Sequence, residues 1–410
     1  MIPLKVHVFP SAEVFLQAYQ TYLGNDEETP LTVPAADVAV DNGAVDVVVG
    51  GLMDTFRRVK SHPSGDVAQG VSIILSSIAL PAHRDAEEDI EIDVIRHTPY
   101  LHGALEIKGS ILMMIGAPNA DTYHMATPNS KRHLQPWLAQ PRVMDSIVTA
   151  LRAINAPPMR SVYAPERLAS ALVAAWGESN EPMLAPCEQP SLTTRLALTT
   201  ASTCHAAGQQ ALFNTEDELR VVDIVTLRTE IDEVDMKRLV EALVEFVCSF
   251  FGSTVEQSGQ IARKMIQEVL DADEAGRLWL CVSKPQLNPP NMGRTDINIH
   301  GQLNPPTASN DGLSLSGYVY TGRQTAGTIA IRNVFTSPEK RGKGIAARLV
   351  HAASRWWLVS ADEKKRKGAV SLFVEPTNQP ATRAYLRSGF VIQDEIWIRK
   401  GFEGVEMGAF

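Results

Sequence analysis

The stretch Asn333-Val334-Phe335-Thr336-Ser337-Pro338-Glu339-Lys340-Arg341-Gly342-Lys343-Gly344-Ile345-Ala346 decides the fold, because it joins a strand to a helix through a short glycine-containing loop. Upstream, residues 328–335 have the β-branched and apolar content of a buried strand, and Pro338 ends that run because proline cannot donate to a sheet. Downstream, apolar side chains recur at every fourth position, the spacing of one helix face: Ile345, Leu349, Ala353 and Trp357. We therefore expect a turn near Ser337 and a helix that begins close to Gly344.

The start of this helix is suited to an anion. No Ser, Thr, Asp or Asn directly precedes its first turn, so its first backbone N–H groups need another partner. Gly342 and Gly344 can adopt positive φ and let a ligand approach the backbone, while the helix dipole favours negative charge. Arg341 and Lys343 add positive charge suited to phosphate oxygens. The loop is a candidate cradle for a diphosphate, and an ordinary tight connection is the alternative.

The spacing Arg341-x-x-Gly344-x-Ala346, after a strand and before a helix, resembles the acyl-CoA signature of the GNAT N-acetyltransferase superfamily, Gln/Arg-x-x-Gly-x-Gly/Ala. It matches neither the dinucleotide fingerprint G-x-G-x-x-G nor the P-loop, which ends in GK[ST]. The resemblance implies acetyl-CoA as co-substrate. The residues that it implies for binding the diphosphate are Arg341, Gly342, Lys343, Gly344, Ile345 and Ala346. Val334, Phe335 and Thr336 are implied to hold the pantetheine arm through their backbone.

A second block supports the same family. A strand over residues 370–374 is followed by a helix over 379–387, which Asn378 can cap and which Gly389 can end in a left-handed conformation. This block resembles the GNAT pattern Asn-x-x-Ala-x-x-x-Tyr-x-x-x-Gly-Phe. The resemblance implies that Tyr385 protonates the departing CoA sulfur and that Asn378 approaches the pantetheine arm. Glu375 lies near enough in sequence to be considered as a general base, or it is a surface carboxylate at a strand end.

Composition limits the other possibilities. The chain has 410 residues, which suggests two domains, and its 44% hydrophobic and 21% charged content is that of a globular protein. A net charge of −9 argues against non-specific nucleic-acid binding. No apolar stretch approaches the roughly 20 residues of a membrane helix, and the first residues lack the apolar core of a signal peptide. We expect a cytoplasmic protein without membrane or nucleic-acid partners.

The cysteines do not suggest a metal site. The four of them are scattered, with no C-x-x-C pair and no Cys/His cluster: Cys187, Cys204, Cys248 and Cys281. We expect reduced thiols in or near the cores and no bound metal.

The order of elements suggests two related halves. Residues 213–410 are expected to form a catalytic GNAT domain, with strands over 219–227, 276–282, 313–321, 328–335 and 370–374 and helices over 235–251, 254–272 and 379–387. Residues 1–212 repeat the pattern but not the residues, with helices over 11–23, 45–60, 142–154 and 165–176 and strands over 70–80, 104–107, 110–115, 161–163 and 192–200. The fold class expected is α/β with a mixed sheet.

The first half lacks the cradle. Its strand ending near Gly116 runs into Ala117-Pro118-Asn119-Ala120-Asp121-Thr122, without Arg-x-x-Gly-x-Ala. Residues 1–212 are therefore interpreted as a degenerate GNAT-like N-terminal domain, with an unrelated α/β domain as the alternative.

Two further segments have alternative interpretations. Residues 285–317 contain Asn-Pro-Pro twice and almost no periodicity, so they are expected to be a long flexible insertion, either a surface loop or a lid over the acceptor site. The basic run Lys364-Lys365-Arg366-Lys367 is interpreted as a solvated loop, although it mimics a localisation signal.

The sequence thus predicts an acyl-CoA-dependent N-acyltransferase that transfers acetyl from acetyl-CoA to a primary amine of a small molecule or amino acid by direct attack. The alternative is a non-catalytic acyl-CoA-binding sensor or scaffold, against which the presence of Tyr385 weighs. The expected partner is a small-molecule amine, and the acyl chain length, the general base and the oligomeric state are left open.

Overall fold

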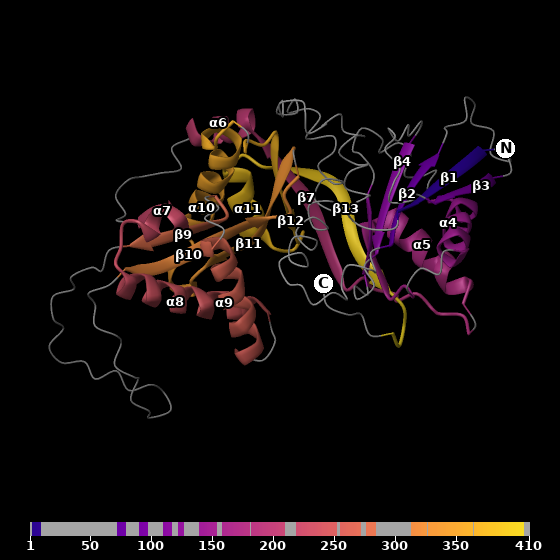
Figure 1. The fold of residues 1–410 in the computed structure, drawn as a ribbon, viewed down its shortest axis with the longest axis horizontal. Coiled ribbons are helices and arrows are strands. Elements are labelled where there is room, and N and C mark those ends of the chain that lie inside the picture. Colours follow the sequence, from indigo (N-terminus) through magenta and orange to yellow (C-terminus); the bar gives the residue numbers. More distant parts are fainter. Residues whose placement is uncertain are drawn as a thin grey trace. The chain divides into compact units, whose positions relative to one another are not determined.

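The computed structural model describes residues 2–9, 72–78, 90–96, 110–116, 122–126, 139–153, 158–180, 182–209, 219–251, 255–271, 276–283, 313–325, 327–363 and 365–405. The chain divides into two compact units (Figure 1). Unit 1 comprises Met1–Cys204, Gly322–Ala330 and Trp357–Phe410, and unit 2 comprises His205–Thr321 and Ile331–Trp356. The expected domains, residues 1–212 and 213–410, were defined by the repeated order of elements and not by packing. That division stays a prediction.

Unit 1 contains a mixed sheet, so the predicted mixed α/β fold is confirmed. Its strands follow the spatial order β3-β1-β2-β4-β5-β6-β13-β7-β12, next to the start of β11. The pairs β1/β3, β5/β6 and β11/β12 are parallel and the others are antiparallel. The strands are β1 (Ile2–Phe9), β2 (Ser72–Ile78), β3 (Ile90–Arg96), β4 (Ser110–Gly116), β5 (Thr122–Ala126), β6 (Ser161–Pro165), β7 (Leu192–Thr200), β11 (Thr328–Thr336), β12 (Ala369–Val374) and β13 (Val391–Gly401).

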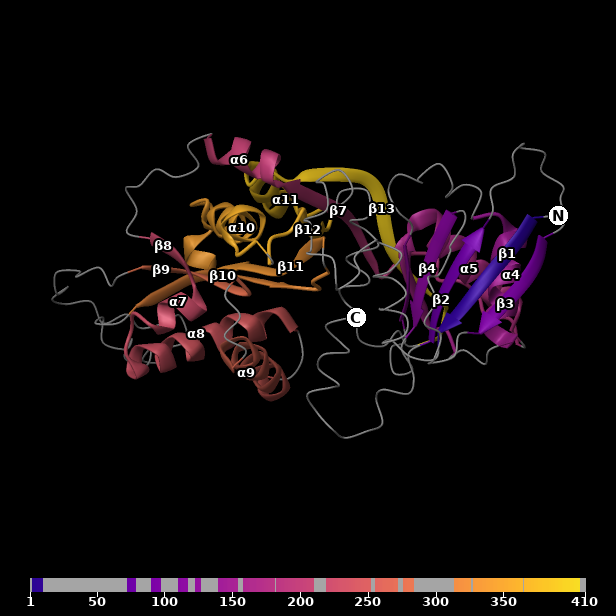
Figure 2. The same ribbon diagram turned by 45° about the horizontal axis from the view of Figure 1, so that its top comes forward.

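Helices α4 (Pro141–Ala153) and α5 (Glu166–Glu178) lie side by side on one face of this sheet (Figures 1 and 2). Their apolar stripes meet the alternate residues of the strands that point toward them, which is how an amphipathic helix covers a pleated sheet. Buried residues from both helices and from the sheet form this core, among them Ile147, Leu151, Leu172, Val162 and Ile398.

The last strands of the two halves are exchanged within unit 1. Strand β7, from the first half of the sequence, pairs with β12 and β13 of the second half. Reciprocally, β13 lies between β6 and β7 of the first half. Each of the two final strands is therefore hydrogen-bonded on both sides, and at least one neighbour of each comes from the other half of the sequence. Backbone pairing ties the two halves together here.

Unit 2 consists of an antiparallel sheet with helices on both faces. Its strands are β8 (Leu219–Asp223), β9 (Leu278–Ser283), β10 (Ser314–Gly322) and the end of β11. Helices α8 (Glu233–Phe251) and α9 (Val255–Asp271) cover one face, and α10 (Ile345–Arg355) covers the other (Figure 2). The core under α8 and α9 includes Leu243, Val247, Ile266, Leu280 and Tyr318.

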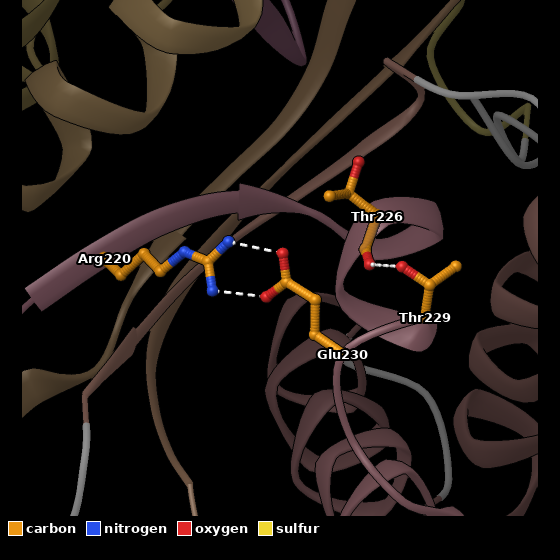
Figure 3. A network of polar contacts seen from close by, with 4 residues as sticks. All are labelled: Arg220, Thr226, Thr229 and Glu230. Carbon is orange, nitrogen blue, oxygen red and sulfur yellow. Dashed lines mark hydrogen bonds and ion pairs between the residues drawn. The ribbon is translucent and has the colours of Figure 1, made fainter.

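Strand β8 is shorter than expected, because residues 224–227 are helical. The Asp223 carboxylate accepts a hydrogen bond from the Val225 N–H at 3.0 Å and thereby caps α7 (Ile224–Arg228). After α7, the Thr229 hydroxyl donates to the Thr226 carbonyl at 2.8 Å, and Glu230 forms a two-pronged ion pair with Arg220 of β8 (Figure 3). The Arg220 guanidinium lowers the pKa of the Glu230 carboxyl. These local side-chain bonds outweigh the strand propensity of the apolar residues.

Other expectations also need correction. Strands β1, β3 and β5 and helix α6 (Ala201–Gln209) were not predicted. Residues 117–121, where the first half was expected to lack a cradle, lie outside the described residues. Ser314 to Gly317 belong to β10, not to a flexible insertion, while residues 284–312 lie outside the described residues. The expected helices at 11–23 and 45–60 and the strand at 104–107 also lie outside them.

The basic run near residue 365 is only partly solvated. Lys365 is exposed, but Lys367 is buried, with its ammonium group donating to the Thr325 carbonyl at 2.6 Å. The Lys367 N–H also donates to the Trp357 carbonyl. Lys367 therefore has a structural role in unit 1. The sequence did not indicate this role, because Lys367 lies in a run of charged residues that was expected to be solvated.

Candidate functional site

The glycine loop has the predicted place and form in unit 2. Strand β11 ends at Thr336, and the turn follows as the short 3-10 helix η3 (Pro338–Lys340). The Ser337 N–H donates to the Ser316 carbonyl of β10 at 3.0 Å, and the Arg341 Nε donates to the Thr336 carbonyl at 3.3 Å. The loop is thus hydrogen-bonded both to the end of β11 and to the neighbouring strand β10.

Helix α10 begins at Ile345 with a glycine at its N-cap. Gly344 has φ +75° and Gly342 has φ +79°, and no side chain caps the helix. A Cβ at either glycine would meet no heavy atom of the described chain within 4 Å. Arg341 and Lys343 are exposed beside them, whereas Ile345 is buried and anchors the helix. An open, basic helix N-terminus of this kind suits a phosphate group.

The end of β11 leads directly into this loop. Val334, Phe335 and Thr336 are half-buried. The Phe335 ring lies 4.8 Å from the ring of Phe246 in α8 and 6.1 Å from that of Tyr318 in β10. Phe335 therefore faces the α8 side of the sheet, and its neighbours in the strand face the other way.

Tyr385 lies in unit 1, on α11 (Gln379–Arg387), the helix predicted for it. Its side chain is 9% exposed and lies beside the Phe390 ring, with centroids 6.2 Å apart. Burial raises the pKa of the Tyr385 hydroxyl to about 12. The group is therefore protonated at neutral pH, as an unshifted tyrosine is, and burial makes it a weaker acid.

Asn378 and Gly389 determine where α11 begins and ends. The Asn378 Oδ1 accepts a hydrogen bond from the Ala381 N–H at 3.1 Å, as expected for an N-cap. Gly389 has φ +91°, and a Cβ there would lie 2.5 Å from the Thr203 carbonyl oxygen. The side-chain oxygen of Asn378 is thus used by the cap, which leaves its exposed amide nitrogen for a ligand.

The structure brings together in unit 2 the residues predicted to bind the diphosphate, 341–346, and the strand residues predicted to hold the pantetheine arm, 334–336. Asn378 and Tyr385 belong to unit 1, on one helix, and Glu375 is an exposed residue just after β12. Sequence reasoning missed three buried hydroxyl groups next to the loop, those of Ser316, Tyr318 and Thr336, which have no hydrogen-bond partner among the described residues. A serine or threonine in an apolar strand gives no signal of this kind.

Neither a metal-binding cluster nor a membrane-spanning helix is found in the described ranges. They contain no cluster of three His, Cys, Asp or Glu side chains able to hold a metal ion. Among the helices described, none is both long and apolar enough to cross a membrane.

Comparison with known proteins found a family match within the second half of the chain. Residues 308–392 match the family model described as acetyltransferase (GNAT) domain. This part of the chain is similar to the GNAT acetyltransferase domain. The match begins ahead of β10 and ends in β13, so it includes the glycine loop, α10 and the helix of Tyr385. The comparison with curated proteins gave no match.

Several solved structures are similar to the chain over most of its length. One is a tandem GNAT protein from the clavulanic acid biosynthesis pathway, at 12% identity and TM-score 0.45, covering 98% of this chain and 99% of that one. Another is a GCN5-related N-acetyltransferase from Sphaerobacter thermophilus, at 15% identity and TM-score 0.38, covering 91% and 92%. These likenesses are remote, so the similarity to GNAT acetyltransferases is attributed to residues 308–392 alone.

Proposed function

We propose that the protein is an acyl-CoA-dependent N-acyltransferase that transfers acetyl from acetyl-CoA to a primary amine of a small molecule or amino acid. The observation that carries the proposal is the start of α10: a left-handed glycine at the N-cap, no side-chain cap, and two exposed basic residues beside it. No heavy atom of the described residues lies within 4 Å of a Cβ built at Gly342 or Gly344, so the backbone there is open to a ligand such as a diphosphate.

The residues of unit 2 would hold the co-substrate. Arg341 and Lys343 would neutralise the diphosphate, and the backbone of Gly344 to Ala346 would donate to its oxygens. The backbone of Val334 to Thr336 would bind the pantetheine arm, as the family resemblance implies. Strand β11 pairs with β12 over its first three residues, Thr328 to Ala330, which precede this stretch.

Acetyl-CoA supplies a thioester, whose acyl carbon is attacked by the lone pair of the acceptor amine. Tyr385 holds a proton that the thiolate sulfur takes as the carbon–sulfur bond breaks, since burial keeps the hydroxyl protonated. The amine must lose a proton as the new amide bond forms. An alkylammonium with a pKa near ~10.4 is mostly protonated at neutral pH, so a base or a chain of waters is required.

The deciding experiment is thiol release from acetyl-CoA against a panel of primary amines and amino acids, with calorimetric titration of CoA in parallel. Turnover with an amine and none without it supports the transferase. Binding of acetyl-CoA without release in the presence of any amine supports the sensor or scaffold instead. Failure to bind acetyl-CoA contradicts both functions.

A further inference from the structure

Gly317 lies at an irregularity in the strand next to the proposed site. The pairing of β10 with β9 shifts in register between Leu315 and Gly317, which leaves Ser316 as an extra residue. The Ser316 carbonyl accepts the Ser337 N–H at 3.0 Å, just past the end of β11. The bulge in β10 is therefore bonded to the point where the glycine loop begins.

The absence of a side chain at Gly317 allows an unusually close approach. A Cβ there would lie 2.5 Å from the Phe335 carbonyl oxygen, 3.3 Å from the Thr336 Cα and 3.3 Å from the Leu349 Cδ1. The nearest of these atoms belongs to the backbone, so no change of rotamer would relieve the overlap. Any other residue at this position must displace β11 at Phe335.

The three contacts belong to both parts of the proposed acyl-CoA site. Phe335 and Thr336 lie in the stretch proposed to bind pantetheine, and Leu349 is in the second turn of α10, whose N-terminus is proposed to bind the diphosphate. The contact at Gly317 thus sets the strand end and the helix relative to each other. A shift of either would separate groups that must bind one extended ligand together.

The same junction contains buried hydroxyl groups that lack partners. The Ser316 Oγ and the Thr336 Oγ1 have no hydrogen bond among the described residues, and the same holds for the Tyr318 hydroxyl. A buried hydroxyl without a partner costs free energy, so these groups do not themselves hold β10 and β11 in this arrangement.

We propose that Gly317 is a positioning residue of the acyl-CoA site, which holds the end of β11 and the N-terminus of α10 in the spacing that the co-substrate requires. The inference rests on the proposed function, because it takes residues 334–336 and 341–346 as the binding site. Gly317 itself touches only the protein. It acts through Phe335, Thr336 and Leu349.

Gly276 provides a matched control in the same unit. It has φ +89°, and a Cβ there would overlap the ring of Trp356, which lies just beyond the C-terminal end of α10. Both Gly317→Ala and Gly276→Ala should therefore destabilise the protein. Gly276→Ala acts at the C-terminal end of α10, which is about 16 Å from the N-terminal end at a rise of 1.5 Å per residue. Only Gly317→Ala acts on the half of α10 that begins at the proposed diphosphate site.

The test is calorimetric titration of CoA into the full-length wild type and both variants, with thermal unfolding measured on the same samples. We expect Gly317→Ala to weaken CoA binding about tenfold or more, since small misplacements in a binding site cost this much. Gly276→Ala should bind within about twofold of the wild type despite a lowered unfolding temperature. Equal affinities for the two variants would overturn the inference.

A second pair of variants covers the case in which Gly317→Ala does not fold. Leu349→Ala removes the side chain that contacts Gly317, whereas Val350→Ala removes an equally buried neighbour on α10. Leu349→Ala should weaken CoA binding more than Val350→Ala does, and equal effects would again overturn the inference. A wild type that binds no CoA would refute the proposed function itself, so the two failures are distinguishable.

Discussion

Ala197 of β7 lies opposite Leu372 of β12 on one side and opposite Ile392 of β13 on the other. A residue from the first half of the chain thus lies between two strands of the second half, the strands that precede and follow the helix of Tyr385 in the sequence. The first half of the chain therefore supplies strands that complete the sheet of unit 1. The sequence had suggested two halves in succession, and the pairing makes each depend on the other.

This dependence predicts the behaviour of truncated chains. A fragment of residues 213–410 loses β7, so it leaves β12 and β13 with unpaired edges and exposes apolar surface. We expect it to aggregate, and a fragment of residues 188–410, which keeps β7, to remain in solution to a greater extent. Size-exclusion chromatography and sedimentation of the two fragments provide the measurement. A monomeric, fully active 213–410 fragment would refute the prediction.

The proposed diphosphate site can be tested at Gly344 with two substitutions that have the same shape but differ in charge. Asp and Asn have similar volumes, and both tolerate a left-handed φ, but only Asp adds a negative charge at the helix N-terminus. We expect Gly344→Asp to weaken CoA binding at least about tenfold relative to Gly344→Asn, because like charges a few ångströms apart cost on the order of 1–4 kcal/mol. Calorimetry at two salt concentrations should show the difference shrinking in high salt. Equal CoA affinity of the two variants would show that this loop does not bind the diphosphate.

The proposed acid can be tested with Tyr385→Phe, which removes the hydroxyl and keeps the ring beside Phe390. We expect the single-turnover rate to fall by about 10²–10⁴-fold, the usual contribution of a general acid, while CoA affinity stays the same. Phe390→Leu serves as a control, since it alters the packing but leaves the proton donor. An unchanged rate in Tyr385→Phe would assign the proton to water.

The raised pKa of Tyr385 makes a separate prediction about pH. Its folded-state value of about 12 lies above the ordinary 10.0, so the folded protein holds this proton more tightly than the unfolded chain does. The associated stability is complete below the unfolded value and is lost as the pH rises from there toward 12. In unfolding measurements, the wild type should lose more stability over this alkaline range than Tyr385→Phe does. Identical pH profiles would mean that the hydroxyl is not buried as described.

How much the sequence could predict depended on whether the signal was local. The caps at Gly344 and Asn378 and the boundaries of α11 follow from neighbouring residues, and the structure has them where they were expected. The helical turn after Asp223 was missed because apolar residues 224–227 also suit a strand, and the side-chain cap decides between the two. Strand β5 was missed because it is short and carries polar Thr122 and His124.

The rest could not be predicted, because it depends on residues far apart in the chain. Nothing near Leu192 to Thr200 indicates that this strand pairs with β12 and β13. Likewise, the close approach of Gly317 to Phe335 depends on a register shift, which has no local signature in an apolar strand. The family that residues 308–392 match could be predicted from short motifs. The long-range contacts made by β7 and Gly317 could not.

The unpartnered hydroxyl of Tyr318 predicts an unusual result for its removal. Tyr320, two residues along the same strand and in the same core, accepts a hydrogen bond from the Arg277 Nη2 at 3.1 Å and so provides a matched control. Tyr320→Phe should lower the free energy of unfolding by about 1.5–3 kcal/mol, the usual value for a bond to a charged group. Tyr318→Phe removes a buried hydroxyl without a partner among the described residues, so it should leave the free energy unchanged or raise it. Urea unfolding of both variants gives the comparison. A loss of stability in Tyr318→Phe as large as that in Tyr320→Phe would mean that the Tyr318 hydroxyl is hydrogen-bonded in solution.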